Sequence, residues 1–229
     1  MSHDKLKSLF DEWATNGRDA SMESGHSDVV EQVVSTLEIG FGEQILDLGC
    51  GNGWATRLLA KTAAGSGAVG VDASPKMIAR AEELHSYTIR AKYEAAPFEA
   101  LPFKDGQFDR AFSMEAIYYA VDLPKALSEL ARVLKPGAAT DLVLDFYAGR
   151  PGVSGWPARL GLELVELDEA GWKSALEAAS FGEVRAERVI DRRGPGEESS
   201  FEPSEWWPSF ADRVAYHEAG SLHLIAKRS

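Results

Sequence analysis

The sequence predicts an α/β protein built on a doubly wound, Rossmann-like and mostly parallel sheet with helices on both faces. Apolar runs of strand length alternate with amphipathic segments of helix length along the chain. The run 45–48 is followed at once by three glycines within 49–53 and then by a helical pattern over 54–61. Strand, glycine turn and helix form the opening unit of such a fold, in which a ligand approaches bare backbone beside a helix N-terminus.

The composition of the chain suits one domain with a sizeable core. Its 229 residues are 45% hydrophobic and 26% charged, as in ordinary soluble globular proteins. The net charge of −12 repels phosphate backbones, which argues against a nucleic-acid partner. Cys50 is the single cysteine, so no intrachain disulfide can form. Because we find neither a signal peptide nor an apolar run of membrane-spanning length, we expect a cytoplasmic protein without a membrane partner.

Two helices are expected before the first strand. Over 4–14, apolar residues from Leu6 to Trp13 recur at helical spacing. A polar break follows at 15–19. A second helix is expected over 27–38, with Ser27 as its N-cap and four valines on its buried face.

The segments after the glycine turn continue the alternation. A strand at 68–72 follows a glycine-containing loop, and Ser74-Pro75 supplies a cap and an N1 proline for a helix to about residue 85. Asp122 opens another helix, which ends at Lys135-Pro136-Gly137. By the same patterns we expect strands at 91–96, 108–114, 142–146, 184–190 and 222–226, a helix at 168–180, and loops at 97–107, 147–167 and 192–208.

The glycine turn departs from the dinucleotide fingerprint G-x-G-x-x-G/A. The third position of that fingerprint is Trp54 or Thr56, depending on the glycine pair from which the count begins. The motif present over 47–53 is Asp-x-Gly-x-Gly-x-Gly, with its acidic residue at the strand end. A second acidic residue, Asp72, ends the next strand 19 residues after Gly53. That spacing is typical of a carboxylate that binds the hydroxyls of a nucleoside ribose.

These features resemble the class I S-adenosylmethionine-dependent methyltransferases, and among them the type 11 methyltransferase domain family. Besides the motif at 47–53, the similarity includes Val71-Asp72-Ala73-Ser74, Leu101-Pro102-Phe103 and the segment 132–137, and it spans about 40–146. The resemblance implies a seven-stranded sheet with the last strand antiparallel. It also implies a single methyltransferase domain over 1–229, with an N-terminal helical cap at 1–40, a cofactor-binding core at 41–146 and a C-terminal part at 147–229 that holds two insertions.

The resemblance also implies S-adenosylmethionine as the cofactor. The glycines would pass its methionine part, Asp47 would position its ammonium group, and Asp72 would accept both ribose hydroxyls. Asp47 could instead only order the turn, and Asp72 could only cap a loop. The family often has an acidic residue that binds the adenine amino group at the position where this chain has Pro97. The full set of expected cofactor residues is Asp47, Gly49, Gly51, Gly53, Asp72, Ala73, Met77, Phe98 and Met114.

Groups that face the methyl are expected near the end of the strand 108–114 and at the start of the second helix. His26 could act as a general base or simply lie at the surface. Tyr118 and Tyr119 could form an aromatic cage for an amine, or belong to the core. The candidates for catalysis are His26, Glu115 and Tyr118. Those for substrate binding are Trp13, Tyr119, Tyr147 and Trp156, with Glu23 and Asp145 in the wider set and no metal site.

The expected function is methyl transfer from S-adenosylmethionine to a small-molecule acceptor by in-line displacement, with an amine slightly preferred. Adenine-amino methyltransferases resemble one another in an Asn/Asp-Pro-Pro-aromatic motif that this chain lacks, and one cysteine is too few for arsenite chemistry. The pair Trp206-Trp207 serves equally well as a packing anchor, a homodimer contact or a substrate lid. The alternatives are a nicotinamide-dependent oxidoreductase and a cofactor-binding protein without turnover.

Overall fold

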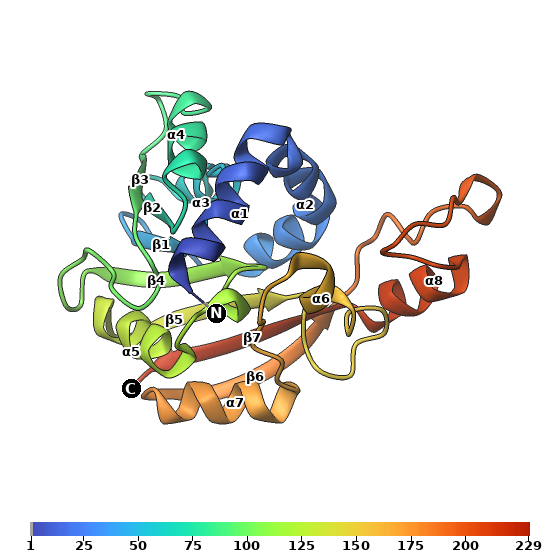
Figure 1. The fold of residues 1–229 in the computed structure, drawn as a ribbon. Coiled ribbons are helices and arrows are strands. Elements are labelled where there is room, and N and C mark those ends of the chain that lie inside the picture. Colours follow the sequence, from blue (N-terminus) through green and yellow to red (C-terminus); the bar gives the residue numbers. More distant parts are fainter. Residues whose placement is uncertain (1) are drawn as a thin grey trace.

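A seven-stranded sheet of order β3-β2-β1-β4-β5-β7-β6 forms the centre of the computed structural model, which describes residues 2–229 (Figure 1). Strand β7 runs antiparallel to both of its neighbours, and the other pairs are parallel. The predicted fold class, including the antiparallel last strand, is therefore confirmed. The strands are β1 (Gln44–Leu48), β2 (Gly67–Asp72), β3 (Ala91–Ala95), β4 (Phe108–Met114), β5 (Leu134–Leu144), β6 (Phe181–Val189) and β7 (Ser221–Arg228).

Helices pack on both faces of this sheet. On one face, Leu127 and Leu130 of α5 and Trp172 and Leu176 of α7 belong to one buried apolar cluster. A second cluster joins the valines of α2 to Leu59 of α3 and to α4 on the other face. The helices are α1 (His3–Asn16), α2 (Arg18–Thr36), α3 (Trp54–Thr62), α4 (Pro75–Glu83), α5 (Leu123–Val133), α6 (Trp156–Leu160), α7 (Glu169–Ala178) and α8 (Phe210–Ala219).

Helix α2 begins nine residues earlier than predicted. Gly17, with φ +83°, is the only residue between α1 and α2, so Ser27 lies inside a helix and does not cap one. The Ser27 hydroxyl donates a hydrogen bond to the Ser24 carbonyl instead. The first half of α2 carries no apolar stripe because its inward-facing side chains, Asp19 and His26 among them, line a cavity rather than the core.

Strand β5 also begins earlier than predicted, at Leu134. Its pairing with β4 shifts between the pairs Phe108–Leu134 and Arg110–Ala139, which places Lys135-Pro136-Gly137 in a bulge. Because the ladder is interrupted there, the missing N–H of Pro136 costs no ladder hydrogen bond. The helix ends before this tripeptide, as predicted, but the strand continues through it.

Two short helices lie in or beside the segments that were expected to be loops. Helix α6 interrupts 147–167, and α8 follows the segment 192–208, which also holds the 3-10 turn η2 (Glu198–Ser200). The side chains of Ser209 and Asp212 form a capping box at the start of α8. No residue of α8 is buried, so the helix lacked the periodicity that reveals helices in a sequence. The segment 190–220, which includes α8, projects from the body of the molecule (Figure 1).

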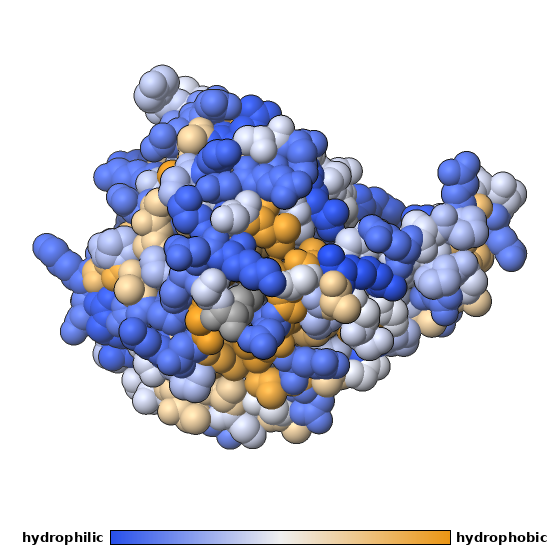
Figure 2. Space-filling model, in the orientation of Figure 1, coloured by the Kyte–Doolittle hydropathy of each residue, from blue (hydrophilic) through white to orange (hydrophobic). Residues whose placement is uncertain are grey.

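The face that carries α1, α5 and α6 is mostly hydrophilic, but apolar side chains gather between these helices (Figure 2). Leu160, Leu164 and Val165 are among the partly buried residues that pack against the core. No helix within 2–229 combines the length and the apolar character that crossing a bilayer requires.

Candidate active site

The glycine turn after β1 forms one wall of a cavity at the carboxyl ends of the parallel strands. Most of the surface that lines it is apolar, with a few polar groups among the lining residues, as is usual for small-molecule sites. Strands β1 and β2, helix α2 and the segment after β4 all contribute to it. Of the nine expected cofactor residues, only Gly53 does not line this cavity. The eight that do are Asp47, Gly49, Gly51, Asp72, Ala73, Met77, Phe98 and Met114.

The three glycines of the turn have different reasons to be glycine. All have positive φ, but an added Cβ at Gly49 would lie 2.1 Å from the Cβ of Ala116. At Gly53 it would lie 2.4 Å from the ring of Tyr93. At Gly51, with φ +52°, it would meet nothing within 4 Å, because this glycine faces the cavity. Gly49 and Gly53 are therefore required by packing, whereas Gly51 leaves room for a ligand.

Alanine substitutions of Gly51 and Gly49 should separate these two roles. Gly51→Ala should fold with a loss of about 1 kcal/mol from its left-handed backbone. It should also bind S-adenosylhomocysteine at least tenfold more weakly, because the methyl group enters the cavity. Gly49→Ala should be markedly less stable because its methyl group overlaps Ala116. Thermal unfolding and calorimetric titration measure both effects, and wild-type affinity in a folded Gly51→Ala would contradict the assignment of the cavity.

The two carboxylates beside the turn are buried and bonded. Asp72 accepts hydrogen bonds from the backbone N–H groups of Gly51 at 3.0 Å and Ser74 at 2.8 Å. Burial raises the pKa of Asp72 to about 6, against these two bonds. Burial also raises the pKa of Asp47 to about 7, although the Thr56 hydroxyl donates to it at 2.5 Å. Since a carboxylate has about four acceptor sites, Asp72 can order the turn and still accept ribose hydroxyls.

Helix α2 covers the glycine turn and adds Asp19 and Met22, which were not expected from the sequence, to the expected His26 and Glu23. The side-chain amide of Asn52 donates to Asp19 at 3.2 Å and to Glu23 at 3.1 Å. Asp19, Met22 and His26 line the cavity from one side of α2. The i, i+3, i+7 spacing of these three residues would have indicated a common helix face, had the polar segment been assigned to a helix.

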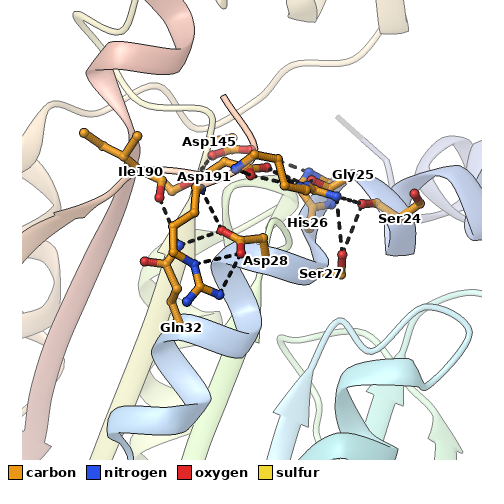
Figure 3. A network of polar contacts seen from close by, with 12 residues as sticks. Ser24, Gly25, His26, Ser27, Asp28, Gln32, Asp145, Ile190 and Asp191 are labelled. Carbon is orange, nitrogen blue, oxygen red and sulfur yellow. Dashed lines mark hydrogen bonds and ion pairs between the residues drawn. The ribbon is translucent and has the colours of Figure 1, made fainter. Parts of the chain in front are cut away.

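At the far end of the cavity, His26 faces Asp145, which follows β5. The Nε2 atom of His26 lies 3.5 Å from a carboxylate oxygen of Asp145 (Figure 3). Asp145 also accepts hydrogen bonds from the Arg150 guanidinium and from the Ser221 hydroxyl. Three segments that are distant in the sequence thus hold one carboxylate beside the imidazole.

Glu115 links this cluster to Tyr118. Its carboxyl accepts hydrogen bonds from the backbone N–H of Asp145 and, at 2.6 Å, from the hydroxyl of Tyr118. The φ of Glu115 is 54°, a left-handed conformation that a non-glycine residue rarely adopts. The backbone therefore turns sharply after β4 and aims the Glu115 side chain toward Asp145 and His26.

The electrostatic surroundings separate the protonation states of these groups. Burial acts to raise the pKa of Asp145, but Arg150 and His26 outweigh it and hold the pKa well below its usual range. Burial and the neighbouring Asp145 raise the pKa of Glu115. Burial acts to lower the pKa of His26, but its hydrogen bond and charge interaction with Asp145 prevail, so the pKa is raised. Asp145 is thus ionised, Glu115 is the protonated acid of the cluster, and His26 is a strengthened base.

His26, Glu115 and Asp145 also present ligand atoms within 4.8 Å of one another, close enough to surround a metal ion. The guanidinium of Arg150 already forms an ion pair with Asp145 at this place. A divalent ion would lie beside that fixed positive charge and would displace existing hydrogen bonds. The donor set therefore fits a hydrogen-bonded cluster better than a metal centre.

A second cavity, the aromatic cavity, adjoins the first at His26 and Glu115. Trp13, Tyr119 and Trp156, all expected at the substrate, lie on its wall together with Tyr118. Tyr147 lies on neither cavity, because its hydroxyl donates to the carbonyls of Ala219 and Gly220. The lining residues are Trp13, Arg18, Ser21, Met22, Gly25, His26, Glu115, Tyr118, Tyr119, Trp156, Leu160, Trp206 and Trp207.

The segment after β6 is fastened to α2 beside His26 (Figure 3). Arg193 donates to the carbonyls of Ser24 and Gly25, both at 2.6 Å. Asp28 accepts from the backbone and the side chain of Arg192 at distances of 2.7–2.9 Å. These bonds fix the turn of α2 that carries His26.

The fold and the site define a class I S-adenosylmethionine-dependent methyltransferase. The order 3-2-1-4-5-7-6 with β7 antiparallel, the glycine turn after β1 and the acidic residue after β2 agree with the resemblance seen in the sequence. The chain belongs to the methyltransferase family whose model, described as Methyltransferase domain, matches residues 46–140. S-adenosylmethionine is the methyl donor of this family.

Individual relatives agree with this assignment. An uncharacterised methyltransferase of Synechocystis sp. is 34% identical over 187 residues, which cover 76% of this chain and 83% of the relative. The O-methyltransferase resE of Aspergillus sclerotiorum is 32% identical over 145 residues, 61% of this chain and 54% of the relative. The chain spans about half the length, or less, of several curated relatives that it matches.

Among solved structures, a chain of the Haloferax volcanii complex between the Trm112 methyltransferase activator and its methyltransferase partner is similar over nearly its whole length. The TM-score is 0.87 and the identity 29%, with 95% of this chain and 96% of that chain covered. The similarity includes the regions outside 46–140, to which both the first half of α2 and the segment after β5 belong.

Proposed function

We propose that this chain transfers the methyl group of S-adenosylmethionine to a hydroxyl oxygen of a small molecule, with His26 as the general base. The observation that carries the proposal is the contact of His26 with Asp145 at the place where the cofactor cavity meets the aromatic cavity. A hydroxyl is a weak nucleophile until it loses its proton, so a base within reach of the acceptor favours oxygen chemistry.

The residues of the cluster divide the work of the step. The acceptor hydroxyl gives its proton to the imidazole of His26 while its oxygen forms a bond to the methyl carbon. The carbon–sulfur bond breaks and its electron pair stays on sulfur. The ionised carboxylate of Asp145 stabilises the imidazolium that results, and Arg150 and Ser221 keep this carboxylate in place.

The amine acceptor that the sequence slightly favoured receives no specific support. The aromatic wall that was to cage an ammonium group includes the cationic side chain of Arg18. Burial raises the pKa of Glu115 to about 8, which weakens its attraction for a cation near neutral pH. The relative resE is named an O-methyltransferase, which also supports oxygen as the acceptor atom.

Methyl-labelled S-adenosylmethionine and a panel of small phenols, alcohols, carboxylic acids, amines and thiols test this proposal. We expect transfer to phenols or alcohols and a methoxy signal in the product by NMR. One arm of the screen adds a Trm112-type activator, because the similar Haloferax chain is in complex with one. Labelled products that carry the methyl only on nitrogen or sulfur would overturn the assignment of oxygen. Tight binding of S-adenosylhomocysteine with no transfer in either arm would favour a cofactor-binding protein without turnover.

A further inference from the structure

The aromatic cavity contains a cation that has no counter-ion. The guanidinium carbon of Arg18 lies 4.3 Å from the centroid of the Trp13 ring and 5.3 Å from that of Trp206. Within residues 2–229, no carboxylate forms an ion pair with Arg18. Two indole faces thus hold the side chain in position, and its positive charge is left for something else to neutralise.

Two buried N–H groups on the wall of the same cavity lack an acceptor. They are the Nε atom of Arg18 and the Nε1 atom of Trp156, neither of which finds a hydrogen-bond partner among the described residues. A buried donor without an acceptor costs free energy, so native proteins rarely leave one. Both donors belong to residues that line the place where the acceptor must lie if it is to reach His26. An acceptor molecule with suitably placed oxygens would satisfy them.

The remaining charged groups of the cavity favour an anion. Glu115 is the only carboxyl among the lining residues of the aromatic cavity, and burial raises its pKa. His26 is the other basic residue on this wall, and its imidazole contacts Asp145, which is also paired with Arg150. The carboxyl of Glu115 is already bonded to Tyr118 and to the backbone of Asp145. Nothing on the wall therefore offsets Arg18, which would repel a cationic ligand and attract an anionic one.

The spacing of Arg18 and His26 limits the shape of the ligand. The two residues lie eight positions apart on α2, which corresponds to about 12 Å along the helix axis. The walls between them are aromatic, with Trp13, Tyr118 and Tyr119 among them. A flat, elongated molecule with an oxygen at each end fits this arrangement better than a compact one.

We propose that the acceptor is a flat hydroxylated carboxylic acid, of which Arg18 and Trp156 bind the carboxylate while its hydroxyl faces His26. This inference rests on the proposed function, because it places the carboxylate on the molecule that is methylated. Arg18 can donate to the two carboxylate oxygens from its planar fork, and the Trp156 N–H supplies a further donor. The aromatic rings on either side of Arg18 exclude water and strengthen these bonds.

The test compares 4-hydroxycinnamate with its uncharged methyl ester as probes, in calorimetric titrations of the chain saturated with S-adenosylhomocysteine. The acid should bind at least tenfold more tightly than the ester. Arg18→Met should remove at least tenfold of the affinity for the acid, while the affinities for the ester and for S-adenosylhomocysteine change less than twofold. Arg159→Met is the matched control, because this exposed arginine also lies over Trp206, at 5.4 Å, but not on the wall of the cavity. It should leave the affinity for the acid within twofold.

Equal affinities for acid and ester, binding of neither, or an unchanged affinity in Arg18→Met would each overturn the inference. The measurement needs no methyl transfer, so it fails independently of the proposed function. Tight, Arg18-dependent binding of the acid with no methylation of any hydroxyl would leave the anion site standing and refute His26 chemistry. Methylation of uncharged phenols, without preference for acids, would support the proposed function and refute the anion site.

Discussion

Replacement of Asp145 by Asn is expected to lower the free energy of unfolding by about 3–5 kcal/mol, because it leaves a buried guanidinium without its counter-ion. The side chains of Arg150 and Asp145 are only 3% and 8% exposed. The other contacts of Arg150 are backbone carbonyls and aromatic rings, among them Tyr216 at 3.6 Å, and none carries a full negative charge. Asn would keep the bond from Ser221 but would not neutralise Arg150.

A thermodynamic cycle distinguishes this explanation from a general loss of packing. For a chain of this size, each kcal/mol corresponds to roughly 2–4 °C in the melting temperature, so the single variant should melt well below the wild type. The double variant Asp145→Asn/Arg150→Met should recover at least half of the loss, since it removes the uncompensated charge. If the losses of the two single variants simply add, the ion pair does not have the energetic role assigned to it.

The cofactor half of the site could be predicted from sequence because its signals are local. Asp47, Gly49 and Gly51 lie within five residues, and the turn that they form follows directly from a strand and precedes a helix. Asp72 ends the adjacent parallel strand, so the carboxyl ends of β1 and β2 bring it to the same edge of the sheet. Its bond to the Gly51 N–H, at 3.0 Å, is the expected outcome of that topology.

The acceptor half could be predicted only as separate candidate residues, because the contacts between them form only in the folded chain. Ser221 reaches Asp145 from the start of β7, 76 residues further along the chain, whereas Arg150 reaches it from the loop directly after β5. Arg18 was not predicted as a site residue, because it lies in the segment 15–19, which was interpreted as a polar break. That segment is helical, but it faces a cavity and so lacks the apolar stripe on which helix prediction depends.

Removal of the imidazole of His26 should have the largest effect on turnover. We expect His26→Ala to lower kcat for a hydroxyl acceptor by about 10²–10⁴-fold, the usual contribution of a positioned general base. The affinity for S-adenosylhomocysteine should change little, since the cofactor retains the turn, Asp47 and Asp72. A comparable loss of cofactor affinity would show instead that His26 serves the cofactor cavity, which it also lines.

The pH dependence of the wild-type enzyme gives a second, independent readout of the same residue. Asp145 raises the pKa of His26 above its ordinary value, and only the unprotonated imidazole can accept a proton. Turnover should therefore be constant at high pH and should fall about tenfold per pH unit once the pH drops below the pKa of His26. That pKa lies above the ordinary value of about 6.5. In His26→Ala the residual rate should lose this dependence.

Glu115→Gln provides the matched variant for this experiment. Because burial and Asp145 raise the pKa of Glu115, its side chain is a neutral acid near neutral pH, and a neutral amide of the same shape should preserve the low-pH limb of the wild-type profile. If instead Glu115→Gln removes the limb while His26→Ala retains it, the base is the carboxylate. The imidazole would then be a positioning group held by Asp145. The two profiles decide between these assignments because His26 and Glu115 both line the two cavities and both lie beside Asp145.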